Sequence, residues 1–200
     1  MKLCLRGELK QELLPETCPM KAFPDLAKFL VEHYRSQENK RLYRASVSVE
    51  KEGYMRWPRI RETLELAKRL EASKVGIAFC VGLSKEAEEV SSLFERWGFQ
   101  VYSVCCKCGS IDKAELGLGR EVRMREEFDP ACNPILQAEL LNRAGTQLNI
   151  LVGLCVGHDA LFCRYSKAPV TTLIVKDRVT GHNPLIAFYT SYHRRLIYPP

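Results

Sequence analysis

The stretch NILVGLCVGHD, residues 149–159, decides how we expect this chain to fold. It continues an apolar run from Leu148 to Leu154, which has the length and composition of a buried strand. The run ends in small and reactive residues, among them Cys155 and His158. In an open α/β sheet, ligands bind at the edge formed by the carboxyl ends of the strands. The stretch therefore predicts a strand that delivers reactive side chains to such an edge.

Two other apolar runs end in cysteine in the same way. Residues 75–79 precede Cys80, and residues 101–104 precede Cys105. A fourth strand is expected at residues 170–175. A strand, a helix and a strand of these lengths form a right-handed parallel crossover. The pattern predicts a three-layer, Rossmann- or flavodoxin-like α/β fold with a parallel sheet of about four strands, in the order 2-1-3-4.

The helices of this fold are predicted from their periodicity and from the residues at their ends. Asn133 and Pro134 are typical of an N-cap and a first helical residue, and Gly145 is typical of a helix end. The helices expected in this part of the chain are residues 84–97, 134–144, 158–165 and 184–196.

We expect two regions along the chain. Residues 1–55 are predicted to form a mostly helical N-terminal extension that contains Cys4 and Cys18. Residues 56–200 are predicted to form the α/β domain with a cysteine-rich site. In the segment 42–54, β-branched residues favour a strand whereas length and charge favour a helix, which we prefer. The other helices expected early in the chain are residues 25–35 and 58–70.

Composition describes an ordinary soluble globular protein. Hydrophobic residues make up 46% of the chain and charged residues 27%. No apolar run approaches the roughly 20 residues that a membrane span needs, and the start MKLCLRGELK lacks the apolar region of a signal peptide. The net charge of +6 is spread along the chain rather than gathered in a stripe. We therefore expect a cytoplasmic protein that binds neither nucleic acid nor membrane.

Nine cysteines are many for a chain expected in a reducing compartment, where metal binding and thiol chemistry are more common than disulfides. Thiolates select zinc, copper(I) or iron–sulfur clusters over hard cations. The sequence predicts a transition-metal site, zinc or an iron–sulfur cluster, with Cys106 or His158 as an additional ligand. The four cysteines expected to converge on the sheet edge are Cys80, Cys105, Cys132 and Cys155.

Other interpretations of these residues stay open. Cys105 and Cys108 form a C-x-x-C spacing, which metal knuckles share with redox pairs. A metal-free enzyme would use Cys132, just before a helix N-terminus, as the nucleophile and His158 as the base. A plain binding module would use Cys80 and its neighbours only as core residues. Whether the chain is an enzyme therefore stays open, as does a redox partner protein or a small-molecule ligand.

Motifs that would point to other chemistry do not occur. The chain contains no G-x-G-x-x-G after the first expected strand, no G-x-x-x-x-G-K-[ST] and no G-x-S-x-G. Ordinary dinucleotide enzymes, nucleotide-dependent enzymes and α/β hydrolases are therefore poorly supported.

A long irregular segment, residues 107–131, separates the second and third expected strands. Loops of this length are usually functional or disordered. Because both ends of the segment are expected near the cysteines, we predict that it folds over them as a lid, with Met124 and Phe128 pointing inward. The alternative is a disordered surface excursion.

Five long motifs resemble a known family. They are GIAFCVGL (76–83), SVCCK (103–107), CNPILQAELLN (132–142), NILVGLCVGHDALF (149–162) and APVTTLIVKDRVTGHNP (168–184). Together they are similar to a prokaryotic family of unknown function, common in anaerobes, whose members usually carry the label of metal-binding proteins. The resemblance implies a metal centre and a cofactor-binding role for His182 and Asn183. The other residues for which it implies a role are Cys80, Cys105, Cys106, Cys132, Cys155, His158 and Asp159.

Overall fold

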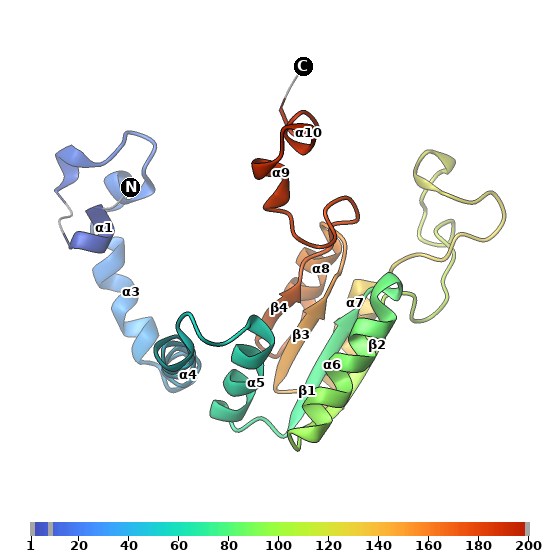
Figure 1. Ribbon diagram of the computed structural model, residues 1–200, viewed down its shortest axis with the longest axis horizontal. Coiled ribbons are helices and arrows are strands. Elements are labelled where there is room, and N and C mark those ends of the chain that lie inside the picture. Colours follow the sequence, from blue (N-terminus) through green and yellow to red (C-terminus); the bar gives the residue numbers. More distant parts are fainter. Residues whose placement is uncertain (1–2, 8–9, 199–200) are drawn as a thin grey trace. The chain divides into compact units, whose positions relative to one another are not determined.

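The computed structural model describes residues 3–7 and 10–198, and the chain divides into two compact units, Met1–Glu52 and Gly53–Pro200. In the described part, no helix is both long and apolar enough to cross a membrane. The segment 42–54 is helical, as predicted (Figure 1). The helices of the first unit are α1 (Leu3–Arg6), η1 (Gln11–Leu13), α2 (Pro19–Ala22), α3 (Leu26–Arg35) and α4 (Gln37–Gly53), whose last residue opens the second unit.

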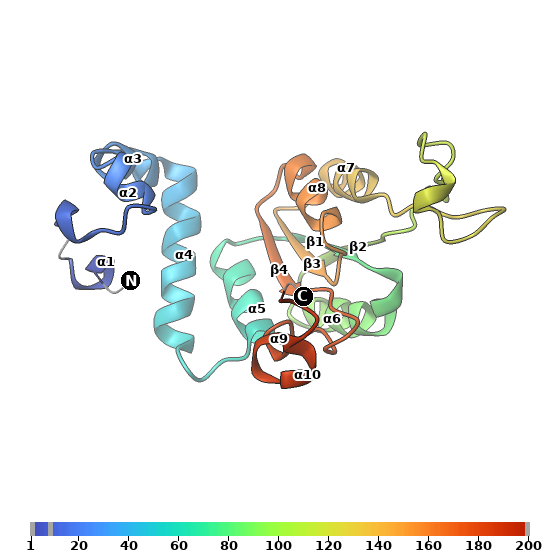
Figure 2. The same ribbon diagram turned by 90° about the horizontal axis from the view of Figure 1, so that it is seen from above.

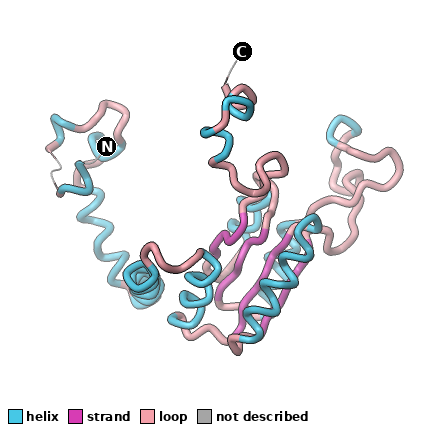
Figure 3. Tube along the Cα trace, in the orientation of Figure 1, coloured by secondary structure: helices cyan, strands magenta, loops and turns pink. Residues whose placement is uncertain are grey.

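The second unit is built on one parallel sheet (Figure 3). Its strand order is β2-β1-β3-β4, and all three neighbouring pairs are parallel, so the predicted fold class and strand order are confirmed. Phe79 lies opposite both Cys105 and Val152, which brings the carboxyl ends of three strands to the same level. The strands are β1 (Lys74–Phe79), β2 (Gln100–Cys105), β3 (Leu148–Val152) and β4 (Val170–Ile174).

Helices cover both faces of this sheet and make three layers. Figure 2 shows α7 and α8 on one face and α5 and α6 on the other. The helices of the second unit are α5 (Arg59–Arg69), η2 (Val81–Leu83), α6 (Ser84–Arg96), η3 (Arg120–Val122), α7 (Pro134–Ala144), α8 (His158–Tyr165), α9 (Ile186–Tyr189) and α10 (Ser191–Arg194).

The core is centred on β3, which is buried along its whole length. Phe94 of α6 and Phe162 of α8 are fully buried, and each such side chain contributes about 2–3 kcal/mol of hydrophobic free energy. Asn149 is the polar residue of this strand, and its side chain accepts from the hydroxyl of Thr146 at 2.8 Å. A Cβ atom at Gly76 would lie 2.1 Å from the Asn149 Oδ1 atom. Glycine in β1 is therefore required by the close approach of β3.

The helix ends explain why α7 starts and stops where predicted. The Asn133 side chain accepts a hydrogen bond from the Leu136 amide at 3.0 Å, and Pro134 needs no donor in the first turn. Gly145 adopts the left-handed conformation, with φ of 71°, at the end of the helix.

The predicted helix over 184–196 is wrong, because the chain forms two short helices there. Thr190 lies between α9 and α10 in an extended conformation, with φ of −111° and ψ of 139°. Its hydroxyl accepts from the backbone amide of His193, which starts a new helix instead of continuing the old one.

The predicted lid is also wrong. Residues 107–131 extend away from the end of β2 in both views (Figures 1 and 2). Met124 is 90% exposed and Phe128 is 47% exposed, so neither side chain is buried over the cysteines. Polar contacts within the segment hold it to itself, including a 2.8 Å ion pair between Lys113 and Asp129.

Candidate functional site

Backbone hydrogen bonds bring three segments together where β1 and β2 end. The Cys106 amide donates to the Phe79 carbonyl at 2.8 Å, and the Cys106 carbonyl accepts from the Asn133 amide at 2.8 Å. The residue before Asn133 is Cys132, so the start of α7 is held beside the end of β2. The backbone therefore holds Cys106 close to Cys132 at this edge of the sheet.

The two thiols lie close enough for each to change the pKa of the other. Cys106 is buried, with 3% of its surface exposed, and Cys132 is half-buried. The hydrogen bond from Cys106 lowers the pKa of Cys132 to about 5, although burial opposes that change. The positive charges of Lys107 and His158 also lower it. The same contact, together with burial, raises the pKa of Cys106. The pair is thus arranged to carry one negative charge, on Cys132, beside a protonated Cys106.

One backbone contact acts in the opposite direction, because it lowers the pKa of Cys106. The Val81 amide, just after β1, donates to the Cys106 sulfur at 3.3 Å. Cys80 is buried and lies in the same apolar cluster as Cys106, and its negative form would repel a Cys106 thiolate. A thiolate at Cys106 is therefore opposed by Cys80 and Cys132, which leaves Cys132 as the charged member.

Cys155, at the end of the segment after β3, has a different partner. The Arg178 Nη2 atom lies 3.1 Å from the Cys155 sulfur. This hydrogen bond raises the pKa of Arg178, and the charges of Cys80 and Cys132 act in the same direction. Cys155 therefore contacts the Arg178 guanidinium group directly, whereas Cys80 and Cys132 act on it only electrostatically.

Cys105 and Cys108 form a tight turn at the end of β2. The Cys108 amide donates to the Cys105 carbonyl at 3.1 Å. The Cys108 sulfur lies 3.7 Å from the Asn133 carbonyl, and burial raises the pKa of this thiol. The C-x-x-C spacing therefore lies directly beside the Cys106–Cys132 pair.

The predicted metal ligands are near one another but are not arranged as a metal centre. Among residues 3–7 and 10–198, no three His, Cys, Asp or Glu side chains form a group that could hold a metal ion. The Cys106 sulfur accepts from the Val81 amide, and the Cys155 sulfur accepts from Arg178.

The histidines occupy two different environments. His158 is the first residue of α8, close enough for its charge to act on Cys132. His182 has φ of 66°, and its Nδ1 atom accepts from the Asp177 amide at 3.1 Å. A neutral His182 ring therefore carries its proton on Nε2. The cofactor-binding role expected for His182 and Asn183 stays a prediction.

His182 also lines a cavity of about 480 Å³ beside β4. Arg59 crosses from α5 to this strand, and its Nε atom donates to the Thr172 carbonyl at 2.7 Å. The residues around the cavity are Arg59, Leu83, Glu86, Thr172, Leu173, Ile174, Val175, Gly181 and His182.

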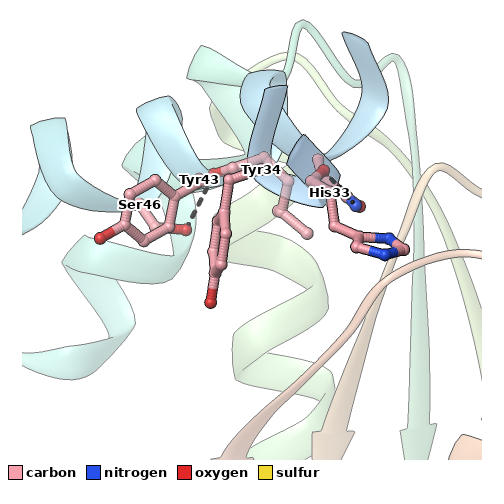
Figure 4. Close-up of a pocket in the computed structure, with 6 residues that line it drawn as sticks. His33, Tyr34, Tyr43 and Ser46 are labelled. Carbon is pink, nitrogen blue, oxygen red and sulfur yellow. Dashed lines mark hydrogen bonds between the residues drawn. The ribbon is translucent and has the colours of Figure 1, made fainter. Parts of the chain in front are cut away.

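A second cavity, of about 400 Å³, belongs to the N-terminal unit (Figure 4). It lies between α3 and α4, where the rings of Tyr34 and Tyr43 meet edge to face with centroids 5.2 Å apart. Its lining residues are His33, Tyr34, Asn39, Leu42, Tyr43 and Ser46, none of which is a cysteine.

The basic residues of the cysteine edge were missed by sequence reasoning. Lys107, Lys176 and Arg178 are single residues in a chain with 30 lysines and arginines, so no motif sets them apart. One signal was present, because Lys176 and Arg178 directly follow the fourth predicted strand. Residues in that position reach the same edge as the cysteines.

Comparisons with known proteins show which family the chain belongs to. Residues 18–173 match the family described as "Protein of unknown function (DUF1847)". The chain is also 46% identical over 169 residues to "Uncharacterized protein MJ0455" of Methanocaldococcus jannaschii, an overlap that covers 84% of this chain and 86% of that protein. The chain therefore belongs to the DUF1847 family of proteins of unknown function.

Proposed function

We propose that this protein carries out thiol–disulfide exchange, with Cys132 as the attacking thiolate and Cys106 as the resolving thiol. The observation that carries the proposal is that the two thiols lie together at an edge of the sheet, close enough for each to change the pKa of the other. It is supported by the backbone bond between Cys106 and Asn133, which fixes the two segments side by side.

The reaction balances without a metal or other cofactor. The Cys132 thiolate attacks one sulfur of a substrate disulfide, the S–S bond breaks, and the other half leaves as a thiolate. Cys106 then loses its proton to solvent and attacks the Cys132 sulfur. The second half of the substrate leaves as a thiolate, and a Cys106–Cys132 disulfide remains. A dithiol reductant returns the pair to its starting state by the reverse exchange.

The roles follow from burial and from charge. Cys132 is half-buried, so an incoming disulfide can reach it, whereas Cys106 is almost wholly enclosed. Lys107 hydrogen-bonds to Cys132 and stabilises its thiolate. A buried thiol held beside its partner is suited to the second, intramolecular step.

The test uses the neutral probe 4,4′-dithiodipyridine with the reduced protein. Wild type is expected to release about two equivalents of pyridinethione per probe molecule, because Cys106 resolves the mixed disulfide. Cys106→Ser should release about one equivalent and keep a pyridine adduct on Cys132. Cys132→Ser should lose the fast phase, and Cys163→Ser, on exposed helix α8, should match wild type. A stable adduct on wild type, or a fast phase in Cys132→Ser, would overturn the proposal.

A second candidate function is binding of a transition metal, zinc or an iron–sulfur cluster. It is favoured by the positions of Cys80, Cys132 and Cys155, which all act on the Arg178 guanidinium group. Because the described side chains do not form a three-donor group, the metal would have to displace the Cys106–Cys132 contact and turn at least one more donor toward it. Elemental analysis of anaerobically purified protein distinguishes the candidates: stoichiometric zinc or iron supports the metal site, and its absence supports exchange.

A further inference from the structure

Lys176 lies across the point where the strand order reverses. Strand β1 leads by way of α6 to β2 on one side of it, and β3 leads by way of α8 to β4 on the other. A Cβ atom on Gly153, at the end of β3, would lie 3.7 Å from the Lys176 Cδ atom. A Cβ atom on Gly82, after β1, would lie 3.2 Å from the Lys176 Nζ atom. The lysine side chain therefore runs from one strand end to the other, in the position where open α/β sheets bind ligands.

The ammonium group of Lys176 has no hydrogen-bond or ion-pair partner in the part of the chain that the structure describes, although the side chain is half-buried. The same point above Gly82 lies 4.0 Å from the Cys80 sulfur, so the ammonium group and this thiol flank one space. A partly buried cation without a partner is unfavourable unless something else neutralises it.

Two more cations border the same edge. Arg178 donates to the Cys155 sulfur at 3.1 Å and acts electrostatically on Cys132. Lys107 donates to the Pro130 carbonyl at 2.5 Å and reaches Cys132 from the other side.

Two carboxylates, one beside Lys176 and Arg178 in the sequence and one at the start of α8, are engaged locally. Asp177 accepts from the backbone amides of Val179 and Thr180, each at 3.0 Å. Asp159 accepts from the Ala160 amide at 2.8 Å. Neither carboxylate makes an ion pair with Lys176 or Arg178 in the described structure, so these carboxylates do not neutralise the two cations.

We propose that the substrate of the thiol pair is a small anionic disulfide, whose carboxylate or phosphate group binds between Lys176 and Arg178 while its sulfur reaches Cys132. This inference rests on the proposed function. Cations beside the reacting thiolate attract an anionic disulfide, whereas they disfavour a cationic one and do not attract a neutral one. A site of this kind selects by charge next to the S–S bond rather than by an extended protein interface.

The experiment compares two aromatic disulfides as probes of Cys132. One is the dianion 5,5′-dithiobis(2-nitrobenzoate), and the other is the neutral 4,4′-dithiodipyridine. The ratio of their rate constants, anionic over neutral, is expected to fall roughly 3–10-fold in Lys176→Met and in Arg178→Met. It should fall likewise in wild type as salt rises from about 0.01 to 0.5 M, because salt screens the attraction.

Two control variants accompany these measurements. Lys68→Met removes a lysine from the C-terminal end of α5 and should leave the ratio at the wild-type value. Lys176→Arg keeps the charge and should restore most of the ratio, which separates loss of charge from loss of structure.

The outcomes separate this inference from the function on which it rests. An unchanged ratio in Lys176→Met and Arg178→Met, with the neutral probe still forming the Cys106–Cys132 disulfide, would overturn the anionic substrate alone. Failure of the neutral probe to form that disulfide in wild type would overturn both proposals. A ratio that falls equally in Lys68→Met would also overturn the anionic substrate, since the effect would then be one of net charge.

Discussion

Burial and neighbouring donors act in opposite directions on the Cys132 thiol. Burial favours the neutral thiol, whereas the hydrogen bond from Cys106 and the charges of Lys107 and His158 favour the thiolate. The donors outweigh burial, and the pKa of Cys132 falls to about 5. The pKa of Cys106 rises in turn, because two adjacent thiols cannot both ionise easily.

This difference predicts the pH dependence of alkylation at Cys132. An ordinary cysteine has a pKa of about 8.5, so its rate with iodoacetamide rises roughly tenfold per pH unit until that value. A lowered pKa moves the plateau to lower pH, so the Cys132 rate should be almost constant above about pH 6 and should fall only below about pH 5. The rate per thiolate is also lower, because nucleophilicity falls with pKa.

The measurement is mass spectrometry of peptides after timed alkylation, with Cys163 as an internal comparison because burial raises the pKa of that thiol. Lys107→Met should move the midpoint of the Cys132 profile to higher pH, since a stabilising cation is lost. A Cys132 rate that climbs through about pH 8 like an ordinary thiol would contradict this assignment of charge.

Single residues also show where sequence reasoning reached its limit. That Cys80, Cys105 and Cys155 fall at strand ends could be predicted, because each follows an apolar run. The pairing of Cys106 with Cys132 could not, because it depends on hydrogen bonds between segments that are 26 residues apart in the printed sequence. Nothing local in the sequence sets those bonds.

Among the elements, α7 has a role that its periodicity does not reveal. Gln137 is fully buried on this helix, and its Nε2 atom donates to the Val104 carbonyl at 2.7 Å and to the Phe79 carbonyl at 3.3 Å. These carbonyls lie at the carboxyl ends of β2 and β1, immediately before Cys105 and Cys80. One side chain therefore fixes the start of α7 against both strand ends.

Replacing Gln137 with methionine, which has a similar volume, should destabilise the fold. Two hydrogen bonds are lost, at about 1 kcal/mol each. The change also removes the buried Oε1 atom, which has no hydrogen-bond partner among the described residues, and this offsets part of the loss. We expect a net decrease of about 1–2 kcal/mol in the free energy of unfolding, measured by urea denaturation.

The matched control is Glu139→Gln, two residues along the same helix. Glu139 forms a surface ion pair with Arg143 at 3.2 Å, with 46% and 77% of the two side chains exposed. Such a pair contributes about 0.5 kcal/mol or less. If Gln137→Met unfolds at the same urea concentration as wild type, the proposed role in holding the strand ends is wrong.

The prediction of whole elements succeeded where apolar runs and end signals agreed. Strands β1 to β4 follow apolar runs, and α7 begins at Asn133 and ends at Gly145 as expected. It failed at 184–196, where apolar spacing continues through Thr190 but a hydroxyl cap restarts the helix. A local side-chain hydrogen bond there outweighs the periodicity.

At the scale of the whole molecule, the course of residues 107–131 could not be predicted from the positions of its two ends. Both ends of 107–131 lie near the cysteines, which was the basis of the predicted lid. The contacts that decide its course are internal: Asp129 pairs with Lys113, and Asp112 pairs with Arg123 at 3.4 Å. Lys113 lowers the pKa of Asp129 to about 2, as does the Met124 amide that donates to this carboxylate. The excursion is folded on itself and leaves the cysteine edge accessible.

The central claim is that Cys106 and Cys132 form the reactive thiol pair, because the topology of the sheet places them side by side. The most direct test is to oxidise the reduced protein with glutathione disulfide, block the remaining thiols, and map the disulfide after tryptic digestion. The dominant linked peptides should be 97–107 and 126–143, with fragmentation assigning the bond to Cys106 rather than Cys105. A dominant Cys105–Cys108 or Cys80–Cys155 link, or no intramolecular disulfide, would contradict the account.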